Sequence, residues 1–249
     1  MKIKRQEVII SFEVDQSIVL TCGSAIKNAQ QKLGGEILTI NTPADAPPSM
    51  PRIILKLKDA YINIGLDRIQ ITTIPPSHVS NKIEESSKFT LQRITPLLEE
   101  LLDVIPKYLW GGVITELNYP EEPLKSKSSN QLATPIFDKL IDIDLNGMEL
   151  SSFQLQYGIK DDQYFVTYTI STYEDRQVKV EVPSTPGQFI RLDSNDYVLT
   201  ECGVGIILDT NNRPSHNITN PLEDIFGMLD KQETLINKIT ENNNLQGVI

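Results

Sequence analysis

The residues best suited to bind an ion are Asp142, Asp144 and Asn146, which alternate with apolar residues and precede Gly147. In a calcium loop, oxygen ligands at the first, third and fifth positions converge on the ion, and a glycine allows the chain to turn. The bidentate glutamate expected at the twelfth position is absent, because Phe153 stands there. The same residues fit a strand whose aspartates face solvent and whose Asn-Gly pair makes a hairpin turn. We therefore predict a strand and a turn here in preference to a metal site.

A second group of polar residues, Asp209, Asn211, Arg213 and His216, follows the apolar run at 204–209. The run predicts a buried strand, and polar side chains at the exit of a strand often build a binding site. The same residue types are also typical of turns. These four residues are thus candidate ligand-binding residues, and the alternative is an ordinary turn.

Nucleophilic catalysis has few candidates, because the chain has two cysteines, Cys22 and Cys202, and two histidines, His78 and His216. A triad would join His216 to the serine before it or to Cys202, together with a carboxylate. The segment around Cys202 lacks the glycine that precedes the nucleophile in a nucleophile elbow. We assign no catalytic residue, and an enzyme is the less favoured interpretation.

Binding sites for phosphate-containing cofactors also lack support in the sequence. Gly203 and Gly205 are followed by a predicted strand and not by a helix, so neither a dinucleotide fingerprint nor a phosphate-binding loop applies. Paired carboxylates such as Glu84 and Glu85 are adjacent in sequence, and adjacent residues on a helix do not face one another. The sequence therefore predicts no cofactor.

The single tryptophan, Trp110, lies between Tyr108 and two glycines, Gly111 and Gly112. An aromatic cluster beside glycines can form a recognition patch. Aromatic residues at the exit of a helix more often fill the core, and we favour that interpretation here.

The elements that must position these residues are mostly strands. Alternating apolar residues predict the strands, and prolines, glycines and aspartates mark the turns between them. Strands at 52–58, 60–66 and 68–74 predict an antiparallel meander, because only short turns separate them. The other predicted strands are 7–14, 36–40, 112–118, 140–145, 152–158, 163–172, 177–182 and 204–209.

Long helices are predicted in three places. The first runs from a cap at Asp15 or Ser17 to about residue 33, before two consecutive glycines. The second covers residues 77–105, where Pro96 either kinks the helix or begins a new one. The third follows Asn220, which can cap it.

The elements fall into two similar outlines, each with several antiparallel strands and a long helix. Residues 121–134 contain prolines, serines and lysines with few apolar residues, which is typical of a linker. We therefore predict an N-terminal half at 1–120 and a C-terminal half at 135–249. The expected fold class is α+β, with mostly antiparallel sheets, long helices and two similar halves.

The 249 residues carry a net charge of −10. The surplus lies entirely in residues 121–249, which hold 20 acidic and 10 basic side chains, whereas residues 1–120 hold 13 of each. An acidic chain is poorly suited to coat duplex nucleic acid or to dock on an anionic membrane. We expect a basic protein partner on the 121–249 half, and assembly of identical copies is a second option.

The cysteines and the N-terminal residues bear on the compartment. Two cysteines are too few for a disulfide framework. The first residues pass directly into a predicted strand, without the apolar stretch of a secretory signal. No apolar run is long enough to span a membrane, and we expect a cytoplasmic protein.

Three segments together resemble a known family. They are EVIISFEV at 7–14, the predicted helix and strand within 83–118, and GIILDTNNRPSHNITNPLEDIFGMLDKQETLINKI at 205–239. The chain resembles an uncharacterised bacterial family of similar length and sporadic distribution. The resemblance implies a shared fold with no established activity, and the sporadic distribution suggests accessory or defence-linked roles.

Two functional hypotheses follow from the sequence. The first is a non-catalytic binding or regulatory protein, such as an immunity protein, an antitoxin or a defence accessory, because catalytic motifs are lacking and the charge suits a basic partner. The second is an enzyme or small-ligand binder that uses Asp209, Asn211, Arg213 and His216.

Overall fold

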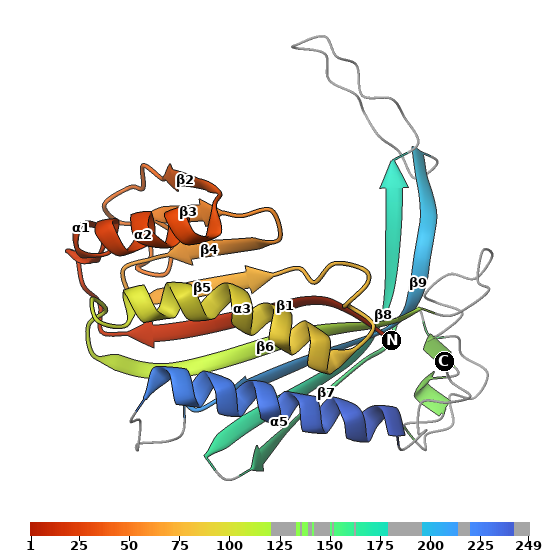
Figure 1. Cartoon of the computed structure of the whole chain (residues 1–249). Coiled ribbons are helices and arrows are strands. Elements are labelled where there is room, and N and C mark those ends of the chain that lie inside the picture. Colours follow the sequence, from red (N-terminus) through yellow and green to blue (C-terminus); the bar gives the residue numbers. More distant parts are fainter. Residues whose placement is uncertain are drawn as a thin grey trace.

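The computed structural model describes residues 1–120, 133–134, 136–138, 141, 150, 152–161, 163–178, 196–213 and 220–241. Nine strands within these residues form one sheet in the order β2-β3-β4-β5-β1-β6-β9-β8-β7 (Figure 1). Every neighbouring pair is antiparallel. The strands are β1 (Lys2–Phe12), β2 (Glu36–Thr39), β3 (Ile53–Lys56), β4 (Ala60–Ile64), β5 (Arg68–Thr73), β6 (Tyr108–Pro120), β7 (Gln154–Asp161), β8 (Tyr164–Val178) and β9 (Tyr197–Asn211).

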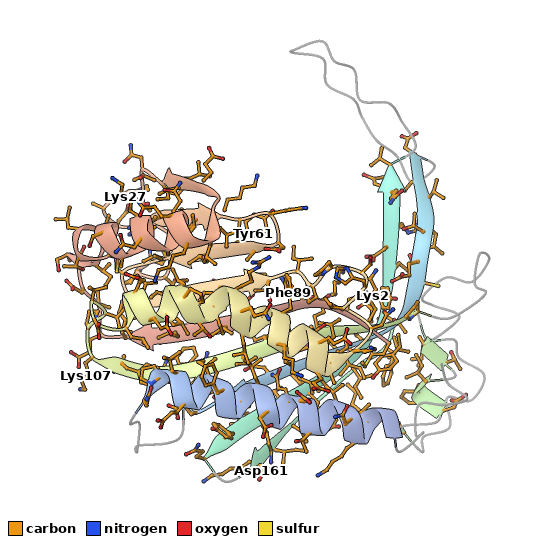
Figure 2. The ribbon with its side chains drawn as sticks, in the orientation of Figure 1. Lys2, Lys27, Tyr61, Phe89, Lys107 and Asp161 are labelled. Atoms are coloured by element: carbon orange, nitrogen blue, oxygen red, sulfur yellow. The ribbon has the colours of Figure 1, made fainter. Side chains whose placement is uncertain are left out.

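Helices cover one face of the sheet. They are α2 (Gly23–Leu33), α3 (Ile83–Leu101) and α5 (Pro221–Glu241), and the short α1 (Ile18–Thr21) precedes α2 (Figure 1). Side chains fill the space between the helices and the sheet (Figure 2). Successive residues of a strand point to opposite faces, so Val8 and Ile10 of β1 are buried under the helices while Ile9 is only half-buried. The opposite face carries no helix in the part of the chain that the structure describes, and we call it the open face.

The expected fold class, α+β with mostly antiparallel sheets, long helices and two similar halves, is wrong. One nine-stranded sheet dominates the molecule, and only three of the described helices have seven residues or more. β6 pairs with β1 on one side and with β9 on the other, so strands from both predicted halves belong to the same sheet. Residues 121–132 of the predicted linker lie outside the described residues.

Several local signals in the sequence are confirmed. The meander of β3, β4 and β5 forms as predicted. Gly34 and Gly35 end α2 with φ angles of 77° and 98°, which residues with a side chain rarely adopt. Pro96 lies inside α3, which continues through it. Asn220 caps α5, because its Oδ1 accepts a hydrogen bond from the backbone N–H of Leu222 at 3.0 Å.

A buried polar network joins the sheet to α3 and α5. Gln6 of β1 donates from Nε2 to the hydroxyl of Thr115 on β6 at 3.2 Å, and its Oε1 accepts from the hydroxyl of Thr90 on α3 at 2.7 Å. The Thr115 hydroxyl in turn donates to Oε1 of Gln232 on α5. Gln232 donates from Nε2 to the carbonyl of Val113 at 2.7 Å. Since buried polar groups are costly when unpaired, this network fixes where both helices dock.

No helix in the described part of the chain combines the length and the apolar character needed to cross a lipid bilayer.

Candidate functional site

The open face presents side chains in rows that cross the sheet from strand to strand. Antiparallel register places residues of neighbouring strands directly opposite one another. Two rows cross the centre of the sheet through β1, β6 and β9, and they are Glu7–Ile114–Asp209 and Ile9–Gly112–Asn211. The central strands therefore place the candidate residues of β9 beside side chains of the N-terminal strands.

Three of the four candidate ligand-binding residues come together here. Asp209 and Asn211 point to the same face of β9, and Nδ2 of Asn211 donates a hydrogen bond to Oδ1 of Asp209 at 3.2 Å. The backbone N–H of Arg213 donates to Oδ1 of Asn211 at 3.4 Å. His216 lies outside the described residues, as do Asp142, Asp144 and Asn146 of the calcium-like motif.

Trp110 joins this group from β6. The guanidinium carbon of Arg213 lies 3.8 Å from the centroid of the Trp110 ring, a stacked cation–π arrangement. A Cβ atom on Gly112 would lie 3.4 Å from Cζ3 of Trp110 and 3.5 Å from Cβ of Asn211. The bare backbone of Gly112 thus accommodates the indole beside Asn211. We call Trp110, Asp209, Asn211 and Arg213 the tryptophan–arginine site.

The favoured interpretation of Trp110 as a core residue is not what the structure describes. Trp110 is half-buried and belongs to a strand, whereas Tyr108 packs against the hydrophobic core. The two glycines after Trp110 look like a strand break, and β6 instead runs through them. Strand alternation alone would place Tyr108 and Trp110 on the same face. The register shift at which Phe12 of β1 pairs with Tyr108 and Ser11 pairs with Trp110 separates them, and the sequence gives no signal for this shift.

Phe165 of β8 is a neighbour of the site that the sequence did not single out. It pairs with Asn211 and is 36% exposed. Its ring covers Gly158 of β7, where an added Cβ would come within 2.6 Å of the ring. β8 carries an aromatic residue on each face, Phe165 on one and Tyr168 on the other. The sequence alone therefore does not indicate which of the two rings faces solvent.

On the helix-covered side, a cluster of polar side chains holds the strand ends behind the site. Asn212 donates from Nδ2 to Oδ2 of Asp224 at 2.7 Å, and the Tyr108 hydroxyl donates to the same oxygen at 3.2 Å. Oδ1 of Asn212 accepts from the backbone N–H of Gly111 at 2.8 Å. Burial raises the pKa of Asp224 above its usual value, although these hydrogen bonds oppose the shift. The cluster ties α5 to β6 and to the end of β9, and so fixes the residues that flank the site.

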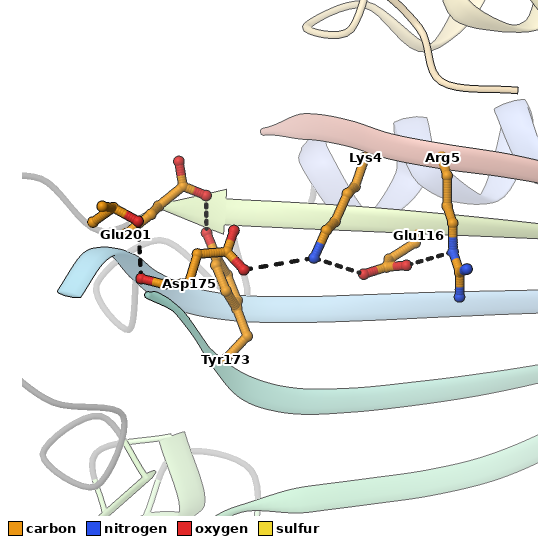
Figure 3. A network of polar contacts seen from close by, with 7 residues as sticks. Lys4, Arg5, Glu116, Tyr173, Asp175 and Glu201 are labelled. Atoms are coloured by element: carbon orange, nitrogen blue, oxygen red, sulfur yellow. Dashed lines mark hydrogen bonds and ion pairs between the residues drawn. The ribbon is translucent and has the colours of Figure 1, made fainter. Parts of the chain in front are cut away.

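A second polar group lies further along the open face (Figure 3). Glu116 of β6 pairs with Nε of Arg5 at 2.7 Å and with Nζ of Lys4 at 3.4 Å, and Lys4 reaches Asp175 of β8 at 3.7 Å. The Tyr173 hydroxyl donates to Oε1 of Glu201 at 2.7 Å. Burial, together with this hydrogen bond, raises the pKa of Tyr173. The carboxylate of Glu116 is thus neutralised by cations of β1.

The described residues offer little for covalent or metal chemistry. Cys22 and Cys202 are buried thiols, and burial raises the pKa of Cys22 to about 11, which keeps it in the unreactive protonated form at neutral pH. No group of three or more His, Cys, Asp or Glu residues suited to a metal ion occurs in the described residues. What the tryptophan–arginine site can do is present an aromatic ring and a guanidinium to another molecule, with the half-buried Asp209 beside them, whereas Asn211 is buried and holds the group together through its hydrogen bonds.

Comparison with protein-family models and with curated proteins finds no match to this chain. The resemblance to the sporadic bacterial family therefore stays a prediction.

Proposed function

We propose that this protein is a non-catalytic binding protein that holds a protein partner on its open face, with the tryptophan–arginine site at the centre of the contact. The stack of Arg213 on Trp110 at 3.8 Å carries the proposal. Tryptophan and arginine are enriched among the residues that dominate binding energy in protein interfaces. Stacking on the indole limits the conformations of the guanidinium before binding, which reduces the entropy lost when a partner orders it.

The shape of the surface favours a protein over a small molecule. Small ligands need a concave site that encloses most of their surface. The side chains of the site instead project from adjacent strands of a wide sheet, and Tyr61 on β4 and Phe165 on β8 extend the same face with half-exposed aromatic rings. Such a broad surface with scattered aromatic residues is typical of a protein interface.

The partner we propose is basic and contacts mainly the 121–249 half. This half carries the whole negative surplus of the chain. On the open face, Asp175 and Glu201 of this half lie on the two-stranded extension of β8 and β9. Complementary charge raises association rates and selects among partners.

We place this function in the cytoplasm, as a regulatory partner such as an immunity protein, an antitoxin or a defence accessory. Both cysteines are buried thiols, which suits a reducing compartment.

Partner capture from the native host tests the proposal. Tagged wild-type protein and the Trp110→Ala and Arg213→Ala variants are compared by quantitative mass spectrometry of the retained proteins. Phe226→Ala is the matched control, because Phe226 is also a partly exposed aromatic residue (39%) but lies on α5, on the helix-covered side. We expect a basic protein that wild type and the control retain and that both site variants lose by tenfold or more.

Direct titration of the purified partner then measures the loss of affinity. If the site variants retain the same proteins as wild type, the open face is not the interface. In that case the alternative, an enzyme or small-ligand binder that uses Asp209, Asn211, Arg213 and His216, becomes the better hypothesis.

A further inference from the structure

The edge strand β7 presents a surface separate from the tryptophan–arginine site. It lies at one margin of the sheet and pairs only with β8 among the described strands (Figure 1). Its register with β8 continues without a bulge over the whole strand. Most of its residues are exposed to solvent: Gln154, Gln156, Tyr157, Gly158, Ile159 and Lys160.

Among the described residues, nothing pairs with the backbone groups on the outer side of β7. The N–H of Thr172 donates to the carbonyl of Phe153 at 3.3 Å, so Phe153 belongs to the residues whose backbone groups face β8. In an antiparallel pair this orientation alternates from residue to residue. The N–H and C=O groups of Gln154, Gln156, Gly158 and Lys160 therefore point outward, where no described strand pairs with them.

The side chains on the helix-covered side of β7 are apolar. Tyr157 and Ile159 are each 43% exposed, and Tyr157 stacks on Tyr168 with ring centroids 5.0 Å apart. Lys231 of α5 pairs with Asp161 at the end of β7, so α5 borders this strip. Soluble proteins protect sheet edges with prolines, bulges or charges, and along β7 the only such device before Asp161 is Lys160.

We propose that β7 is a homodimerisation edge, at which the β7 strands of two copies of this chain pair antiparallel across a two-fold axis. A second copy fits because β7 is complementary to itself. With the axis at Tyr157 or at Gly158, Lys160 faces Gln154 or Gln156 of the other copy and never its own counterpart. Tyr157 and Ile159 then meet apolar residues of the other copy, and cross-strand pairs of aromatic and β-branched residues stabilise a sheet.

The dimer forms a continuous sheet of two copies, and the outward backbone groups of both strands become paired. It leaves the tryptophan–arginine site of each copy exposed, because β8 lies between β7 and β9. This proposal does not depend on the proposed function, and its test involves no other partner.

Analytical ultracentrifugation over a concentration series tests the dimer. We expect wild-type protein at high concentration to sediment with twice the chain mass of 28.0 kDa. Ile159→Lys places a charge in the apolar strip, and Gln156→Pro removes an outward N–H while leaving the hydrogen bonds to β8, so both should yield monomers. Leu38→Lys on β2 is the control, since it charges a similarly exposed residue at the opposite edge (37% exposed) and should remain dimeric.

Amide hydrogen exchange of the wild-type protein gives a second measurement that does not depend on how well a variant folds. In the dimer, the outward amides of Gln156, Gly158 and Lys160 exchange as slowly as the inward amides of Tyr157 and Ile159, and dilution restores fast exchange only to the outward set. A wild-type protein that stays monomeric, or a dimer in which the outward amides exchange fast, overturns the proposal.

Discussion

Arg213 illustrates how one side chain can contribute to binding a partner while adding little to the stability of the fold. Its guanidinium covers Trp110 on an exposed surface, where a cation–π contact contributes about 0.5–1 kcal/mol. The same contact strengthens once a partner removes water from it. The stack therefore adds little to the stability of the isolated chain, and its value lies in what it presents to a partner.

Thr115 is the residue on which the buried network depends most. Its hydroxyl accepts from Gln6 and donates to Gln232, so Thr115→Val leaves polar atoms on both glutamines without this partner in a dry environment. We expect the free energy of unfolding to fall by about 2–4 kcal/mol, measured by urea denaturation. Thr72→Val on the open face of β5 is the control and should change stability by less than about 0.5 kcal/mol. Equal effects of the two substitutions would show that the network is not what stabilises the docking of the helices.

Asp224 makes stability depend on pH with a defined sign. Burial raises the pKa of Asp224 in the folded protein, whereas an aspartate in the unfolded chain titrates at about pH 4. Between these two pKa values the folded state binds the proton more tightly than the unfolded state does. Stability from this group is present below that window and falls as the pH rises through it. Asp224→Asn keeps an acceptor for Tyr108 and Asn212 and removes the titration.

The measurement for Asp224 is the difference in unfolding midpoint between wild type and Asp224→Asn at several pH values. We expect wild type to lose stability relative to the variant as the pH rises from about 4 towards neutrality. Burial also raises the pKa of Glu233. Because Glu233 is present in both proteins, its contribution to the difference between them largely cancels. A difference that is constant with pH, or one that changes in favour of wild type, would contradict the assignment.

At the scale of the elements, the sequence predicts well where the causes are local. The β3–β5 meander follows from turn residues, and the end of α2 follows from Gly34 and Gly35. The start of β6 was missed because Gly111 and Gly112 suggest a break. Their actual role is to let Tyr108 and Trp110 lie close to the backbone on opposite faces, and that role depends on contacts that the sequence does not display.

Two glycines of β9 give a matched test of such close approach. A methyl group on Gly203 would collide with the carbonyl oxygen of Tyr119 on β6, whereas the nearest atom to a methyl group on Gly205 would be 3.7 Å away, on Tyr173. Gly203→Ala should therefore destabilise the protein by about 1–3 kcal/mol. Gly205→Ala should be neutral or slightly stabilising, because alanine has less backbone entropy to lose. Urea denaturation of both variants measures the change in the free energy of unfolding. Similar losses of stability in the two variants would contradict the pairing of β6 with β9 around Gly203.

For the whole molecule, the sequence did not reveal that a single sheet contains strands from both predicted halves, and the reason is physical. The residues that join β6 to β9, such as Val113 and Thr210, are far apart in the chain, and hydrophobic periodicity reports only which face of a strand is buried. It does not report which strand lies beside it. The candidate residues Asp209, Asn211 and Arg213 were found from their place after an apolar strand, but their neighbour Trp110 depends on the same long-range pairing.

The uneven charge of the chain leads to the last prediction. If a basic partner approaches the 121–249 half, a reversal on that half should slow association, because long-range attraction between opposite charges raises the rate of encounter. Asp175→Lys is the test, since Asp175 lies on the open face of β8 with 47% of its side chain exposed. Glu36→Lys is the control, because Glu36 is an exposed residue of β2 at the far edge of the sheet.

Stopped-flow or surface-plasmon-resonance measurements at two salt concentrations give the association rate of the captured partner. We expect Asp175→Lys to slow it several-fold at low salt and to matter less at high salt, where the Debye length shrinks to about 3 Å near 1 M. Glu36→Lys should leave the rate close to that of wild type. A larger effect from Glu36→Lys would place the electrostatic contact on the N-terminal half. The charge surplus of residues 121–249 would then have to serve solubility, since net charge far from zero also keeps proteins dispersed.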